Sequence, residues 1–160
     1  MNILKKYRNI GFIVLTIIIS FYAIKKIAPF FYSGAYPFAE TYKLGIRDSL
    51  LIKQIQKFKQ NNPIYIVPKQ CELADHFDKS YNDLFIIFFY YKKENKIIRT
   101  WVSHLDSNTS QLGIVSINSG LDIGNWKDLN DEIDENESNE EISKFENRIL
   151  KKLNVPFKKD

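Results

Sequence analysis

Three side chains that can do chemistry lie within six residues of one another: Cys71, Asp75 and His76. A cysteine thiolate beside a histidine is an activated nucleophile, and the same residue types ligate zinc. The second histidine, His104, stands near Asp106 at the end of an apolar stretch. Neither group has a flanking signature or a ligand spacing typical of a cysteine enzyme or a metal site. We therefore predict no catalytic residues, no metal and no cofactor. A small membrane-anchored enzyme using Cys71 and His76, or His104, is the alternative.

The most acidic stretch is residues 131–141, where seven of eleven side chains are carboxylates. Four oxygen-bearing residues alternate there as the first ligands of a calcium loop do: Asp134, Asn136, Ser138 and Glu140. However, the sixth position of such a loop is Asn139 rather than Gly, and the twelfth is Phe145 rather than Glu. We interpret the stretch as a solvated loop that leads into the N-terminus of a helix, where acids complement the helix dipole. Weak calcium binding is the alternative.

The chain carries a formal net charge of +4, which invites a nucleic-acid interpretation. Residues 1–26 hold five of its 23 Lys and Arg residues and none of its 19 acids. The rest of the chain therefore has 18 basic against 19 acidic residues, a net charge of −1. Such a domain has no electrostatic footprint for phosphate backbones, so we predict no nucleic-acid partner. The six scattered glycines make no phosphate-binding loop, and we predict no small-molecule ligand.

Hydrophobic periodicity predicts an α+β domain made of a helix, a four-stranded antiparallel sheet and a second helix. The first helix is expected over residues 49–60, with Asp48 or Ser49 as its N-cap. The four strands are expected at residues 64–67, 84–91, 97–104 and 111–117. The last helix is expected over residues 137–153, and its apolar side consists of Ile142, Phe145, Ile149 and Leu153.

The hairpin of residues 84–104 supports a sharper prediction, because side chains alternate between the two faces of a strand. A two-residue turn at Glu94 and Asn95 would pair Tyr91 with Ile98, although it would also place Lys93 opposite Lys96. A longer loop would shift this register. One face would carry Ile87, Phe89, Tyr91, Ile98, Thr100 and Val102. The other would carry Ile86, Phe88, Tyr90, Ile97, Arg99, Trp101 and Ser103.

Both faces of this hairpin are apolar, but two short helices can cover only one of them. The second face is therefore either covered by aromatic residues that precede the domain, or it docks a protein partner. Arg and Trp on one face are typical of interfaces. We predict a partner-binding site at Phe88, Tyr90, Arg99 and Trp101. Arg99 could instead form a local cation–π pair with Tyr90.

The strongest signal for location is residues 10–24, fifteen positions without a charge that stand between Lys5, Lys6 and Arg8 on one side and Lys25 and Lys26 on the other. Residues 7–27 are long enough to span a bilayer as a helix. A cleaved signal peptide is the main alternative, with residues 33–35 as the candidate cleavage site. The basic residues before the span outnumber those immediately after it, which favours a cytoplasmic N-terminus and an extracytoplasmic C-terminal domain.

Three regions follow from these patterns. Residues 1–28 form a single-pass membrane anchor with basic flanks, residues 29–42 an aromatic juxtamembrane segment, and residues 43–160 a single α+β domain. Because the domain has one cysteine, it must fold without an internal disulfide bond. The sequence thus predicts a membrane-anchored, extracytoplasmic, non-catalytic protein-interaction module with a possible protein partner in the cell envelope.

Overall fold

The computed structural model describes residues 16, 20, 36–78 and 84–160 of the 160-residue chain. Contacts divide the chain into two units, Met1–Pro37 and Phe38–Asp160. The predicted membrane segment, residues 7–27, lies outside the described residues except at positions 16 and 20, so it stays a prediction. Among the described residues, no helix combines the length and the apolar character needed to cross a bilayer.

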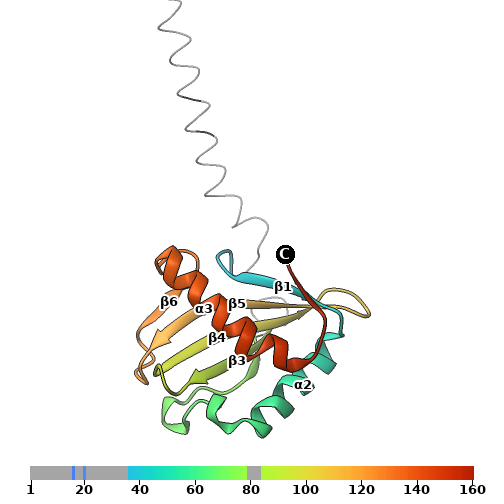
Figure 1. The fold of residues 1–160 in the computed structure, drawn as a ribbon, viewed down its shortest axis with the longest axis horizontal. Helices are drawn as coiled ribbons and strands as arrows, with labels where there is room; N and C mark the ends of the chain where they lie inside the picture. Colours follow the sequence, from blue (N-terminus) through green and yellow to red (C-terminus); the bar gives the residue numbers. More distant parts are fainter. Residues whose placement is uncertain (1–15, 17–19, 21–35, 79–83) are drawn as a thin grey trace, which may run out of the picture. The chain divides into compact units, whose positions relative to one another are not determined.

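The unit Phe38–Asp160 is an α+β domain with an antiparallel sheet (Figure 1). The neighbouring strands run in the order β2-β3-β4-β5-β1-β7, and β6 pairs with β5. The strands are β1 (Glu40–Leu44), β2 (His76–Asp78), β3 (Leu84–Tyr91), β4 (Lys96–His104), β5 (Ser110–Ser119), β6 (Trp126–Asp128) and β7 (Phe157–Lys159). The helices are α2 (Asp48–Asn61) and α3 (Glu135–Arg148), with the 3-10 turns η1 (Pro63–Tyr65), η2 (Lys69–Cys71) and η3 (Leu150–Leu153).

The prediction of four strands was wrong, because the described sheet has seven. Strands β3, β4 and β5 lie where the sequence predicts them. Residues 64–67, predicted as a strand, instead begin with the 3-10 turn η1, which has Pro63 in its first positions. This turn directs Tyr65 into the core, where its ring packs on Phe58 at a centroid distance of 5.3 Å. Burial of an aromatic ring outweighs the extended preference of this short segment.

Strand β1 changes the interpretation of the aromatic residues that precede the domain. Tyr42, which the sequence placed in the juxtamembrane segment, lies in β1 and is fully buried. Its hydroxyl donates a 2.8 Å hydrogen bond to a carboxylate oxygen of Glu146. Burial, followed by this hydrogen bond, raises the pKa of Tyr42. Tyr42 is therefore part of the folded domain rather than of the juxtamembrane segment.

Helix α2 agrees closely with the prediction, but its N-cap is Arg47 rather than Asp48 or Ser49. Helix α3 begins at Glu135 and ends at Arg148, so the predicted helix over residues 137–153 is interrupted. Ile149 departs from helical geometry, and η3 continues the chain as a tighter turn. The predicted apolar side is confirmed, since Ile142, Phe145, Ile149 and Leu153 are all buried.

The predicted register of the β3–β4 hairpin was wrong by two residues. Tyr91 pairs with Lys96, not with Ile98, and the turn spans residues 92–95. The longer turn keeps Lys93 out of the ladder, so it no longer faces Lys96. A shift of two leaves every side chain on its predicted face, because strand side chains alternate with a period of two.

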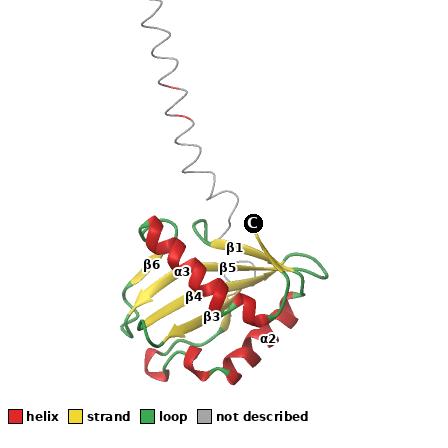
Figure 2. Ribbon diagram, in the orientation of Figure 1, coloured by secondary structure: helices red, strands yellow, loops and turns green. Residues whose placement is uncertain are grey.

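The main core lies between the sheet and the helices, which appear in red across and beside the yellow sheet in Figure 2. It joins residues of α2 and α3 to one face of β3, β4 and β5. Phe89 and Phe145 are buried, and their rings meet edge to face at a centroid distance of 5.5 Å. The helices thus cover the predicted first face of the hairpin. We call the opposite side of β3, β4 and β5 the second face.

Candidate partner-binding face

The four predicted contact residues all lie on the second face. Phe88 of β3 stands directly opposite Arg99 of β4, and Ile86 stands opposite Trp101. None of the four belongs to the core beneath the helices. The alternation of the hairpin therefore brings Phe88, Tyr90, Arg99 and Trp101 together on one side of the sheet, as the sequence predicts.

The four residues differ in how much of their surface is accessible. Phe88 and Trp101 are buried, with exposed fractions of 4% and 5%. Tyr90 and Arg99 are half-buried. Of the four, Tyr90 and Arg99 are thus accessible, while Phe88 and Trp101 lie beneath the surface.

Trp126 of β6 is a component of this face that the sequence reasoning missed. The centroid of its ring lies 4.2 Å from the guanidinium carbon of Arg99. It lies 6.0 Å from the ring centroid of Phe88. The cation–π partner of Arg99 is therefore Trp126 and not Tyr90, whose hydroxyl instead donates to Asn95. The signal available in the sequence was a tryptophan within a Gly- and Asn-containing loop, a large side chain that rarely stands in solvent without a packing partner.

Asn118 of β5 holds the loop that delivers Trp126. This fully buried amide donates 3.0 Å hydrogen bonds to the carbonyl oxygens of Gly120 and Asp122, and it accepts one of 2.9 Å from the N–H of Asn125. Asn118 also pairs with Trp126 in the β5–β6 ladder. The loop is therefore closed by a satisfied polar network, which places the indole beside Arg99.

The Trp101 indole packs closely against Gly113, its neighbour on β5. A Cβ at position 113 would stand only 2.4 Å from Cε2 of the indole, so a glycine is needed at this place. The indole N–H is buried and has no hydrogen-bond acceptor among the described residues. Close approach of the ring to the β5 backbone explains why a residue as large as tryptophan is buried in a sheet face.

An ion pair closes the edge of β3 beside Phe88, where the short strand β2 no longer pairs with it. The ammonium of Lys59 donates to both carboxylate oxygens of Asp75, at 3.0 and 2.7 Å, and to the carbonyl of Phe88 at 3.0 Å. The same carboxylate accepts the N–H of Phe88 at 3.0 Å. Side chains thus satisfy the edge groups that would otherwise invite another strand.

Asp128 of β6 is an acidic residue that interacts electrostatically with Arg99. Its pKa is raised first by burial and then by the charge of Glu132, while Arg99 acts in the opposite direction. Asp128 pairs with Ser116, which itself pairs with Arg99. Arg99 therefore interacts with two residues of β6, the indole ring of Trp126 and the charge of Asp128.

The residues of the alternative catalytic site have other partners. The buried thiol of Cys71 lies 3.6 Å from the carbonyl oxygen of Leu121, and Asp75 is occupied by Lys59. The His76 ring stacks on Phe88, and its Nδ1 is 2.9 Å from the carbonyl of Ala74. His104 is exposed at the end of β4. No described contact joins Cys71 to either histidine, and a Cys–His catalytic pair requires such a contact.

The Cys71 contact has a structural consequence. It joins the segment before β2, at one edge of the sheet, to the loop after β5. Because β3 and β4 lie between β2 and β5 in the sheet, the two joined segments must meet above the end of β4. Ile97, which lies in that end of β4, is fully buried. We infer that these two segments cover one end of the second face.

The acidic stretch leads into α3, as the sequence predicts. The Asp134 side chain caps the helix by accepting the N–H of Asn136 at 3.0 Å. Glu135 and Glu137 occupy the first turn, where negative charge is favourable. Among the residues that the structure describes, no cluster of three or more His, Cys, Asp or Glu side chains is arranged to hold a metal ion.

Comparison with protein-family models, with curated proteins and with solved structures found no significant match.

Proposed function

We propose that this protein is a non-catalytic interaction module held at a membrane by residues 7–27, with its C-terminal domain on the extracytoplasmic side. The support for the anchor is the uncharged run of residues 10–24 between basic flanks. The unit Phe38–Asp160, which follows this run, has its own core and sheet. A compact domain behind an anchor is suited to present a surface to a partner in the cell envelope.

The observation that carries the interaction proposal is the contact of Arg99 with Trp126. The guanidinium lies 4.2 Å from the ring, and both side chains remain half-buried rather than enclosed. Tyr90 is also half-buried on this face. Tyr, Trp and Arg are the residues that most often dominate binding energy at interfaces. In this proposal Tyr90 and Arg99 contact the partner, while Phe88 and Trp101 support them from below.

The membrane proposal is tested by fractionation and by a reporter. The full-length protein should remain in the membrane fraction after high-salt and carbonate washing. A reporter fused after Asp160 should behave as extracytoplasmic. Recovery of a soluble mature protein that begins near Tyr36 would contradict the anchor and indicate a cleaved signal peptide.

The interaction proposal is tested by placing a photo-crosslinking amino acid at position 90 in cells. We expect one crosslinked partner, absent when the crosslinker replaces the exposed Gln56 of α2. Arg99→Ala should weaken the purified complex by about 2 kcal/mol or more, roughly thirtyfold, at unchanged stability. Lys127→Ala, which removes an exposed positive charge of β6, is the matched control and should bind normally.

Two further variants separate this proposal from the enzyme alternative. Cys71→Ser and His104→Ala should both leave partner capture intact. Loss of the cellular activity in Cys71→Ser, with normal stability and normal capture, would overturn the interaction-module proposal.

A further inference from the structure

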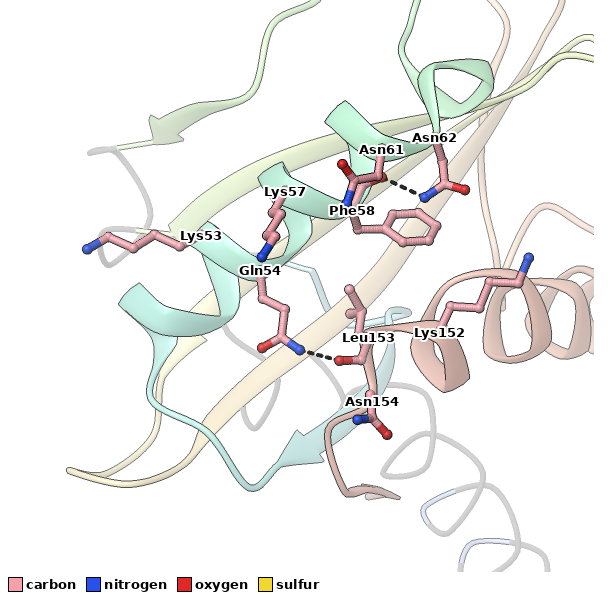
Figure 3. Close-up of a pocket in the computed structure, with 9 residues that line it drawn as sticks. All are labelled: Lys53, Gln54, Lys57, Phe58, Asn61, Asn62, Lys152, Leu153 and Asn154. Carbon is pink, nitrogen blue, oxygen red and sulfur yellow. Dashed lines mark hydrogen bonds between the residues drawn. The ribbon is translucent and has the colours of Figure 1, made fainter.

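A positively charged cleft lies between α2 and η3 (Figure 3). Its volume is about 580 Å³, within the range of about 300–1,000 Å³ that small-molecule sites occupy. Lys57 lies on the α2 wall and Lys152 on the η3 wall, and the ring of Phe58 lies between them. Lys53 lies one turn before Lys57 on α2. Three cations from two separate elements therefore border one hollow.

No acid lines this cleft. Within the described chain, none of these three lysines has a carboxylate within 4.0 Å, whereas Lys59 has one and Lys96 and Lys144 have two each. Lys53 and Lys57 stand at positions i and i+4 of one helix, where like charges destabilise the helix by a few tenths of a kcal/mol. An anion in the cleft would remove this repulsion.

Amide side chains complete the lining. Gln54 donates a hydrogen bond to the carbonyl oxygen of Leu153 and so ties α2 to η3 across the cleft, and Asn62 donates to the carbonyl of Phe58. The amides of Asn61 and Asn154 also line the cleft. Amides both donate and accept hydrogen bonds, which suits hydroxyl groups. The nearly buried Phe58 and Leu153 offer an apolar floor.

We propose that this cleft binds the phosphate group of a small polyol phosphate. Lys57 and Lys152 are exposed on opposite walls of the cleft (Figure 3). Their long, flexible side chains would turn toward the phosphate, which lysine binds as a point charge. The amides would bind the hydroxyls, and the floor would contact the carbon chain. The same glycerophosphate chemistry occurs in a soluble polyol phosphate and in the headgroup of a phosphoglycerol lipid.

The test uses the full chain in a non-ionic detergent, with glycerol 3-phosphate as the probe. We expect a dissociation constant of about 1 mM or tighter by calorimetry. The probe should slow acetylation of Lys57 and Lys152, measured by mass spectrometry, and leave the exposed Lys127 unaffected. Equal protection of Lys127, or the absence of heat and protection at the cleft, would overturn the proposal.

A pair of charge-matched variants separates a site from general attraction. Lys57→Gln with Lys152→Gln should weaken binding about tenfold or more, since hydrogen bonds to charged groups are lost. Lys92→Gln with Lys93→Gln removes the same charge from the exposed β3–β4 turn and should change binding by no more than about twofold. Equal weakening by the two pairs would show that no localised site exists.

The source of the phosphate is distinguished by repeating the acetylation assay in nanodiscs without added probe. Protection of Lys57 and Lys152 by phosphatidylglycerol but not by phosphatidylcholine would assign the cleft to the lipid headgroup. Protection only when glycerol 3-phosphate is added would assign it to the soluble compound. Protection in neither case would contradict the proposal. Binding here is independent of the partner face, so Arg99→Ala should leave it unchanged.

Discussion

Replacement of Gly113 by alanine tests the packing of the second face most directly. The new methyl group would stand 2.4–2.6 Å from three atoms of the Trp101 indole, Cε2, Cζ2 and Nε1. Two carbons in contact prefer about 3.5 Å or more, so the ring or the strand must move by about 1 Å. Trp101 is only 5% exposed, so its ring has little room to move.

Overpacking of this kind costs about 1–3 kcal/mol. The substitution also lowers the conformational entropy of the unfolded chain, which stabilises the folded state by about 0.4–1 kcal/mol and offsets part of this cost. We therefore expect Gly113→Ala to lower the free energy of unfolding by about 1–2 kcal/mol. For a domain of this size, that corresponds to a fall in Tm of roughly 3–10 °C. Thermal unfolding of the full chain in detergent, followed by tryptophan fluorescence, measures it.

Gly45→Ala is the matched control. A Cβ at position 45 would have its nearest neighbour, the carbonyl oxygen of Pro156, at an ordinary 3.8 Å. Its stability should be unchanged or slightly raised. Trp101→Phe, which shortens the ring, should recover part of the loss when it is combined with Gly113→Ala. A Gly113→Ala variant as stable as Gly45→Ala would refute the close packing of Trp101 on β5.

Three other substitutions probe the core and its ion pairs. Lys59→Met leaves the half-buried carboxylate of Asp75 without its cation, so the free energy of unfolding measured in urea should fall by about 2–3 kcal/mol. This is less than a fully buried pair would lose, and a fall under about 0.5 kcal/mol would contradict this role. Phe145→Ala should cost about 3–5 kcal/mol through the cavity it leaves, and an unchanged unfolding curve would show that the core is misassigned. The hydrogen bond from Arg148 lowers the pKa of Glu94 from its ordinary value of 4.5. The pair therefore stabilises the fold fully above about pH 4.5, and this contribution is lost as the pH falls through the lower pKa of the folded state. Glu94→Gln should therefore flatten the acid-induced loss of stability, and an unchanged pH profile would show that this pair is not its source.

Hydrophobic periodicity was sufficient to predict those elements whose structure depends mainly on their own residues. The spacing of Leu51, Ile55 and Phe58 predicts helix α2 and its buried side, and all three are in the core. Alternation in residues 84–104 predicts which side chains share a face, and this held even though the register was wrong. The turn length was not predictable from alternation, because a two-residue shift preserves both faces.

Short strands were missed because pairing partners far away in sequence create them. Strand β7 consists of three residues, Phe157–Lys159, and forms only because β1 offers it an edge. The contact of Arg99 with Trp126 has the same origin, since it depends on the loop that Asn118 folds back along β5. Such pairings require closure of long loops, for which a local window carries no signal.

The sequence by itself determined the uncharged run of residues 10–24, the charge balance of the remainder and the two faces of the central hairpin, because each depends on residue types at fixed spacings. Only the tertiary structure decided that Trp101 is buried on Gly113, that Lys59 and Asp75 close the β3 edge, and that Lys57 and Lys152 border one cleft. These arrangements join residues that the chain separates by up to 95 positions, and close packing of a single core sets their distances.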